Sequence, residues 1–419
     1  MANYIPPHKR QLKDGAKALA GSSLNSRSLA HTFQQQLNLS GSFNSESCSS
    51  ESVRRRMYLH PKSCVSRFFI VDSTKEEEHQ NPGSVRLNRI SSDSILYDKV
   101  GSSPYILVSS CKKTGTDKLK RNSSIENPLI SVAEQILPNL LAFRRMRVEA
   151  SGYKEFKEGE IRLVARFGQI LFHGTPSLNI DTLRDRSELE ASLSGIRRSF
   201  DTHIPKSFPE SVLNVVVPEI GVELEEEKEY YYVRVIDKSC LDVSFTCKCT
   251  TTGVGGLELR KIEANHVRHM IVDIACVEKD LDLRFMLSTR NFVPEASDEE
   301  KHGLEKLIKS AVVDGNEKGG LRFPLGYESL EGRYRVVGIG HTTMRAFKNS
   351  SIKIKFTESD RYEFNTSTAE VTNHVVLIMN GITEILKENN LETDQLARML
   401  EDTMKLLWDY FLRLECCFS

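Results

Sequence analysis

Five strand-like runs of apolar and alternating residues follow one another in the second half of the chain. Short polar connections separate them, and they cover residues 230–236, 241–250, 257–263, 267–276 and 281–289. Gly253, Gly255 and Gly256 stand between two of the runs, where a hairpin loop needs glycine. Consecutive strands without intervening helices usually pair with their sequence neighbours. The pattern therefore predicts an antiparallel meander.

Helical spacing occurs on both sides of these strands. Asn127 and Pro128 form a good N-cap and first helical residue, and Pro138 is expected to kink or interrupt the helix that follows. A long C-terminal helix contains Trp408, the only tryptophan. Its apolar face consists of Leu396, Met399, Leu400, Met404, Leu407, Trp408, Phe411 and Leu414.

A further strand is expected over residues 161–173. Leu163, Ala165 and Phe167 alternate with polar residues, and the apolar positions then shift by one residue. We interpret Gly168 as a bulge that changes the register, so that the later Ile170 and Phe172 face the same core. Other strand-like runs lie at 334–339, 352–356 and 375–379.

The chain divides by composition into three regions. Residues 1–60 are rich in Ser, Gln, Asn and Gly, and their few apolar residues cannot offset an ordering cost of about 1–2 kcal/mol per residue. Residues 61–126 form a partly ordered, strand-containing linker region. Residues 127–419 form the globular region, which is open to division into two sub-domains. The expected fold class is α+β, a mostly antiparallel sheet meander with packing helices and a long C-terminal helix, preceded by a disordered N-terminal arm.

Composition narrows the class of protein further. The chain has 419 residues with 57 basic and 57 acidic ones, so net charge gives no bulk attraction to nucleic acid or membrane. No apolar stretch approaches about 18 residues, so no membrane partner is expected. Nine cysteines, an odd number, favour reduced thiols and an intracellular place in the cytoplasm or nucleus. Organelle targeting stays open, because the arm is Ser-rich and poor in acids.

Common catalytic and cofactor motifs are absent from the sequence. There is no Walker-type phosphate loop, no Gly-x-Ser-x-Gly elbow and no His-Glu-x-x-His helix, so we expect no catalytic residue, cofactor or metal. Gly338 and Gly340 lack the third glycine of a dinucleotide loop. Cys247 and Cys249 share one face of a strand, where packing as small apolar side chains is favoured over zinc binding.

Two polar clusters carry candidate chemistry. His266 and Arg268 share one face of an extended strand and His269 takes the other, and Arg284 is a candidate helper. One interpretation is an anion site, and the other is a half-solvated strand end with His269 hydrogen-bonded in place. The second cluster is an acidic run similar to the alternating glutamates of triphosphate tunnel enzymes, but it occurs once, so a solvated edge is expected. It consists of Glu223, Glu225, Glu226, Glu227 and Glu229.

A seven-residue peptide stands out within the polar arm. It combines an aromatic anchor, an aliphatic neighbour, two prolines that favour an extended backbone, and a basic end. Such a peptide is suited to docking on a protein partner. It consists of Tyr4, Ile5, Pro6, Pro7, His8, Lys9 and Arg10.

This peptide and four further segments, at 163–174, 267–274, 319–326 and 405–409, carry a resemblance. Together they resemble a plant-restricted family of uncharacterised proteins that open with Tyr-Ile-Pro-Pro-His-Lys-Arg. The resemblance implies a plant origin and brings no activity, cofactor or catalytic residue. The opening peptide alone is similar to a segment of DEAD-box RNA helicase N-terminal arms, where a leucine stands in place of Lys9.

The leading functional hypothesis is a non-enzymatic adaptor or RNA-associated protein that docks a protein partner through Tyr4 to Arg10. In a variant, basic residues of the arm contact RNA directly. The alternative is an enzyme that acts on a phosphorylated or anionic substrate through His266, Arg268 and His269.

Overall fold

The computed structural model describes eleven segments of the chain, all within the unit Ser47–Ser419. The described residues are 64–71, 85–90, 104–109, 127–151, 160–173, 186–253, 255–264, 267–290, 298–330, 332–388 and 392–416. The predicted N-terminal arm and its docking peptide lie outside them.

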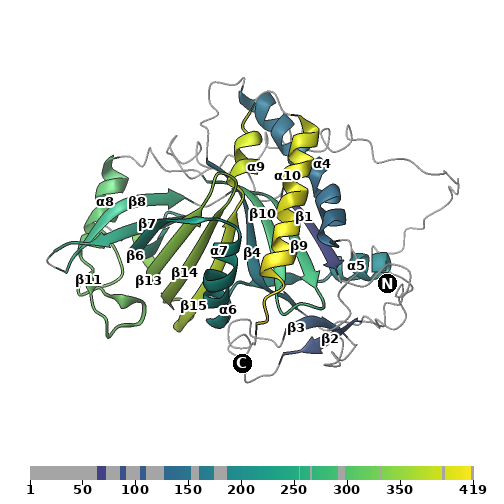
Figure 1. Cartoon of the computed structure of the whole chain (residues 1–419). Helices are drawn as coiled ribbons and strands as arrows, with labels where there is room; N and C mark the ends of the chain where they lie inside the picture. Colours follow the sequence, from purple (N-terminus) through teal and green to yellow (C-terminus); the bar gives the residue numbers. More distant parts are fainter. Residues whose placement is uncertain are drawn as a thin grey trace, which may run out of the picture. The chain divides into compact units, whose positions relative to one another are not determined.

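One strongly curved sheet organises the described residues (Figure 1). Its pairings are antiparallel, except that β1 and β9 run parallel. The main path, in spatial order, is β1 (Val65–Val71), β9 (Val267–Cys276), β10 (Asp282–Arg290), β4 (Glu160–Phe172), β15 (Thr368–Ile378), β14 (Lys353–Glu363), β13 (Tyr334–Lys348), β6 (Glu223–Asp237), β7 (Cys240–Thr251) and β8 (Leu257–Ala264). The predicted fold class, a mostly antiparallel sheet with packing helices, is confirmed.

Three short strands attach beside this path. β2 (Val85–Arg89) pairs with β3 (Tyr105–Ser109), and β3 and β5 (Arg198–Asp201) both pair with β4. A separate two-stranded sheet joins β11 (Val312–Val313) to β12 (Leu321–Arg322), and η7 (Lys318–Gly320) precedes β12.

The predicted meander is interrupted once. β6, β7 and β8 pair in sequence order, and β9 pairs with β10, but β8 and β9 lie at opposite ends of the strand order. The apolar pattern within a strand records which of its faces is buried and does not record its partner. The five predicted strands therefore form two separate antiparallel runs, one of β6, β7 and β8 and one of β9 and β10.

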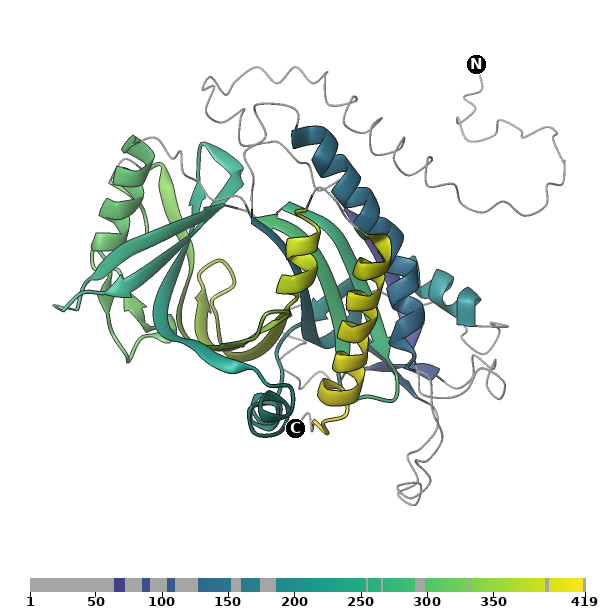
Figure 2. The same cartoon turned by 45° about the horizontal axis from the view of Figure 1, so that its top comes forward.

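Helices cover the outer side of the curved sheet (Figures 1 and 2). The largest core lies beneath α4 (Leu129–Ser151), α9 (Asn380–Ile385), α10 (Thr393–Leu406) and the π-helical turn η8 (Leu407–Phe411) that continues α10. The segment α6 (Ser207–Ser211), η6 (Val212–Val216) and α7 (Val217–Glu219) packs on the same core. A second core separates α8 (Asp298–Lys309) from β6, β7 and β13.

A third core lies on the opposite face of the sheet at its β1 end. There α5 (Arg186–Ser194) packs on β1 and on the end of β4. Leu163 and Phe167 face the first core, whereas Ile170 and Phe172 face this third core. β4 pairs with β10 without a register shift up to Gly168, so the predicted bulge is wrong. The shift in the apolar pattern instead marks the point where the strand passes from one core to another.

Two local predictions about glycine and proline also change. Gly168 is required by close packing, because a Cβ there would lie 2.9 Å from Phe200 Cε1 and closer still to the Asp201 carbonyl oxygen. α4 continues through Pro138, so the predicted interruption is wrong. Pro138 and Glu134 are both exposed, and water can therefore satisfy the carbonyl group that the missing N–H leaves free.

Candidate functional site

The histidine and arginine residues predicted as an anion site do not gather in one place. His266 lies outside the described residues, and Arg268 is exposed. His269 is buried against α4, where its ring lies 4.6 Å from that of Phe143 and its Nε2 lies 2.7 Å from Thr289 Oγ1. Burial lowers the pKa of His269 to about 4, so the imidazole is neutral. His269 is thus hydrogen-bonded in place, as the second interpretation of this cluster expects.

Arg284 points to the opposite face of the sheet. Its Nε and Nη2 donate to the two carboxylate oxygens of Asp273 at 2.6 and 2.9 Å. Arg198 Nε lies 3.8 Å from the same carboxylate, and the Arg284 guanidinium lies 4.8 Å from the centre of the Phe200 ring. Through these contacts Asp273 of β9 connects to Arg198 of β5 and Arg284 of β10. Arg284 is therefore a structural partner of Asp273.

The acidic run forms the first half of β6. Residues 223–229 pair with β13 on one side only, and Glu223, Glu227 and Glu229 are exposed, as expected of a solvated edge. Glu225, which is also exposed, and Glu226 form ion pairs with Lys353 of β14, at a register shift where Glu225 is the extra residue of β6.

Hydrogen bonds from Lys348 and Lys353 lower the pKa of Glu225 to about 2. The acidic run therefore supplies partners to lysines on the inner face of the sheet.

That inner face is best followed along β14. Side chains two residues apart point to the same side of a strand. Ile354 and Phe356 enter the outer core beneath the helices. Their polar neighbours consequently line the inner face, and these are Lys353, Lys355, Thr357, Ser359 and Arg361.

Lys355 has an unusual position among them. Its cross-strand neighbours are Ala346 on β13 and Val376 on β15, so it is half-buried between small apolar residues. Among the described residues it has no hydrogen bond or ion pair. Burial, and then the positive charges of Arg162, Lys353 and Lys248, lower the pKa of Lys355 to about 8, while Glu226 acts in the opposite direction.

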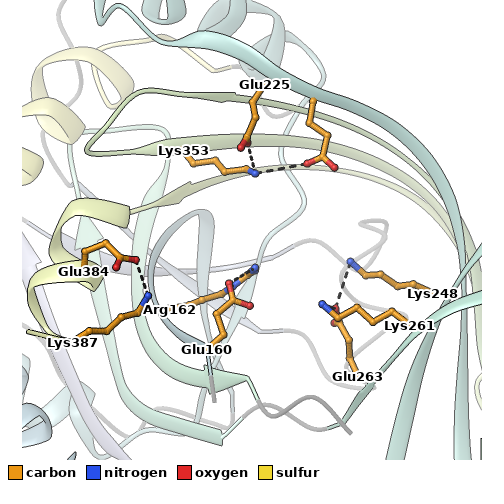
Figure 3. Close-up of polar contacts among 10 residues, drawn as sticks. Glu160, Arg162, Glu225, Lys248, Lys261, Glu263, Lys353, Glu384 and Lys387 are labelled. Atoms are coloured by element: carbon orange, nitrogen blue, oxygen red, sulfur yellow. Dashed lines mark hydrogen bonds and ion pairs between the residues drawn. The ribbon is translucent and has the colours of Figure 1, made fainter. Parts of the chain in front are cut away.

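The neighbouring cations come from three strands, one of which is β14 itself. Figure 3 shows Lys353, Arg162 and Lys248 extending from β14, β4 and β7 towards the same interior space. Arg162 Nε donates to Glu160 at 2.9 Å. On the wall formed by β7 and β8, Lys248 and Lys261 lie 3.7 and 3.6 Å from the buried carboxylate of Glu263. We call Arg162, Lys248, Lys353 and Lys355 the inner cation cluster.

Further along the inner face, side chains of β6 reach β14 across two glycines of β13. A Cβ at Gly340 would lie 2.5 Å from the Tyr232 hydroxyl oxygen, and one at Gly338 would lie 2.9 Å from a Glu363 carboxylate oxygen. Arg234 forms an ion pair with that carboxylate, and Arg361 lies 5.8 Å from the centre of the Tyr232 ring. Gly338 and Gly340 are therefore packing positions within β13.

Arg361 has a second notable property. Its Nε is buried and has no hydrogen-bond partner within the described segments of the chain. The neighbouring His374 is buried, and its Nδ1 and Nε2 lie 2.9 Å from the Thr202 carbonyl oxygen and 3.0 Å from Thr372 Oγ1. Burial, followed by the charge of Arg361, lowers the pKa of His374 to about 3. Positive charge thus continues along the inner face beyond the inner cation cluster.

A pocket of about 390 Å³ lies on the other side of the sheet, between α6 and the strands β6, β13 and β14. Its charged lining mixes acids such as Glu227 and Glu358 with bases such as Lys206 and Arg345. The inner cation cluster contains the half-buried Lys355, which has no ion pair within the described residues, and we therefore take it as the candidate site.

The described segments show no group of three or more His, Cys, Asp or Glu side chains placed to hold a metal ion. Cys247 and Cys249 are buried in the core beneath α8. Burial raises the pKa of both thiols, that of Cys249 to about 12, in keeping with the predicted packing role. None of the helices in the described segments is both long and apolar enough to cross a membrane.

The fold and site define a curved antiparallel sheet with helices outside and charged side chains inside. By sequence the chain belongs to the family of the domain of unknown function DUF7903, whose model matches residues 53–411. No curated protein matches the sequence.

Solved structures with a similar chain course include RNA triphosphatases. The S. pombe Pct1 RNA triphosphatase has 10% identity and a TM-score of 0.40, covering 69% of this chain and 92% of its own. Its structure in complex with the Spt5 CTD gives 10% identity and a TM-score of 0.41, with 69% and 94% covered. The Mimivirus capping enzyme triphosphatase has 8% identity and a TM-score of 0.30, with 67% and 97% covered.

Proposed function

We propose that the inner face of the curved sheet binds an oligoanionic ligand of the phosphate class. The observation that carries this proposal is Lys355, a half-buried lysine among Arg162, Lys248 and Lys353 with no acidic partner in the described residues. A cation in such surroundings is destabilised by burial and by repulsion. A bound anion relieves both effects, which favours binding.

The chemistry of the inner cation cluster suits phosphate oxygens. Nε and Nη2 of Arg162 both lie 2.9 Å from Glu160 Oε1, so its Nη1 donors are the ones left for a ligand, and lysine ammonium groups add charge at adjustable positions. Hydrogen bonds to charged groups contribute about 1.5–3 kcal/mol each. Three such contacts supply about 5–9 kcal/mol, and the loss of ligand freedom reduces this sum, so an affinity in the range of about 0.1–1 mM is expected.

The ion pairs already present do not prevent this. Lys248 is 34% exposed where it meets Glu263, and Lys353 is 16% exposed where it meets Glu225. Pairs with partial solvent access contribute about 0–1 kcal/mol. A multivalent anion competes with these lysine contacts, and the two carboxylates keep a second partner when it binds, Lys261 for Glu263 and Lys348 for Glu225.

Titration calorimetry with inorganic tripolyphosphate tests the proposal on the full chain. Lys355→Met is expected to weaken binding at least about tenfold. The control Lys309→Met removes a 68% exposed lysine of α8 on the outer side and is expected to leave the affinity unchanged. Absence of binding, or equal losses in both variants, contradicts the proposal. Phosphate release, measured in the same samples, separates an enzyme from a binding protein.

A second proposal concerns the arm. Tyr4 to Arg10 form an anchored basic peptide in a polar segment, and we propose that they dock a protein partner of an RNA-associated assembly. Affinity purification of the full chain, compared with Tyr4→Ala and Arg10→Ala variants, tests it. Unchanged partner sets exclude this role for the peptide.

A further inference from the structure

The amine of Lys355 has the character of a nucleophile. An amine attacks a carbonyl carbon only when it is neutral. An ordinary lysine, with a pKa near 10.4, is neutral in about 0.1% of molecules at pH 7.5. With its pKa lowered to about 8, Lys355 is neutral in roughly a quarter of molecules at the same pH.

The surroundings of Lys355 leave this amine available. Ala346 is the smallest side chain that a strand neighbour can offer apart from glycine, and Val376 on the other side is apolar. Lys353, two residues earlier on the same face, provides the contrast, because it forms ion pairs with Glu225 and Glu226. Lys355 has no such partner in the described part of the chain, and no carboxylate occupies its amine.

The cations around Lys355 determine which carbonyl compounds fit. Arg162, Lys248 and Lys353 carry their charges on three different strands around the same space (Figure 3). A ligand with an anionic group and a carbonyl group a few bonds apart is held by its anion while the carbonyl carbon lies beside the amine. Phosphate is the anion that such a mixed arginine and lysine cluster binds best.

We propose that Lys355 forms an imine with aldehydes that carry a phosphate group, which Arg162, Lys248 and Lys353 hold. This inference rests on the proposed anion site. The neutral amine nitrogen attacks the aldehyde carbon to give a carbinolamine, which then loses water. The carbon–oxygen double bond is replaced by a carbon–nitrogen double bond, both amine hydrogens leave in the water formed, and no oxidant or reductant takes part.

Pyridoxal 5′-phosphate is a suitable probe. Its imines have an absorbance band at the boundary of ultraviolet and visible light, and borohydride reduces them to stable secondary amines. The full chain is treated with a limiting amount of probe, reduced, digested and mapped by mass spectrometry. Lys355 is expected to be modified at least about tenfold faster than Lys353 or Lys309. Its rate is expected to rise with pH to half its maximum near pH 8, and tripolyphosphate is expected to slow it. This mapping uses the unaltered chain, so it does not depend on the folding of a variant.

The outcomes separate the two proposals. If tripolyphosphate binds but Lys355 reacts no faster than Lys309, the imine proposal is wrong and the anion site stands. If Lys355 reacts rapidly but tripolyphosphate neither binds nor protects, the anion site is wrong, and with it the phosphate selectivity proposed here. Loss of the absorbance band in Lys355→Met, with the band retained in Lys309→Met, supports the assignment to Lys355.

Discussion

His269 is expected to make the protein less stable as the pH falls from 7.5 to 5. Its imidazole is neutral in the folded state because burial against Phe143 lowers its pKa to about 4. In the unfolded chain the same group has a pKa near 6.5. Between these two values the unfolded state binds more protons than the folded state. Stability is therefore fully present above pH 6.5 and is lost as the pH falls towards 4.

The size of this effect follows from the two pKa values. At pH 5 an unfolded His269 is almost fully protonated, whereas the folded one is protonated in about a tenth of molecules. Proton linkage then removes about 2 kcal/mol of unfolding free energy between pH 7.5 and 5. This is a large share of the roughly 5–15 kcal/mol that stabilises a typical domain.

Urea unfolding at the two pH values measures the loss, with fluorescence of Trp408 as the signal. Trp408 is the only tryptophan and lies in the same core as Phe143, on which His269 packs. His269→Gln keeps a polar partner for Thr289 but does not titrate. We expect the pH-dependent loss to be about 2 kcal/mol smaller in the variant than in the parent protein. Equal losses in the two proteins would show that His269 is not buried as described.

Three further predictions address packing and charge. Gly340→Ala places a methyl group against an aromatic ring and should cost about 1–3 kcal/mol in urea unfolding, whereas Gly253→Ala, which meets nothing within 4 Å, should cost less than about 1 kcal/mol. Asp273→Asn removes the charge that holds Arg284 and should cost about 3 kcal/mol by the same assay. Cys249 should resist iodoacetamide at pH 8 in the folded protein and react after unfolding in urea, as mass spectrometry would show.

The existence of β9 and β10 was predictable because each of them has one face buried in the first core. The runs predicted at 267–276 and 281–289 match β9 and β10 almost residue for residue. The pairing of β8 was not predictable in the same way. Its alternation shows that one face meets a core, but nothing in it shows that the next strand in sequence lies at the far end of the sheet.

β4 illustrates a different limit. Its apolar residues change from odd to even positions after Phe167. A bulge in the strand and a change from one core to another both explain this pattern. In either case the even-numbered residues after Phe167 become the buried, apolar ones. Only the third core beneath α5 distinguishes them, and that core depends on contacts with β1, about 100 residues earlier in the chain.

Only part of the inner cation cluster could be predicted from the sequence. Lys353 and Lys355 alternate with Ile354 and Phe356, which is the pattern of a strand with one charged face. The sequence did not show that Arg162 would approach the same space from a strand nearly 200 residues earlier. That approach depends on β15, which pairs with both β4 and β14 and so brings these two strands to within one strand of each other.

The separation of the two faces has a consequence for experiments on the site. The apolar residues of β14, Ile354 and Phe356, point outward to the helices, whereas Lys355 points inward and contributes no packing to that core. Replacing Lys355 with methionine removes a charge that repels its neighbours and leaves the outer core unchanged. The variant is therefore expected to be at least as stable as the parent protein in urea. A loss of anion binding in Lys355→Met consequently reports on a ligand contact, and not on the fold.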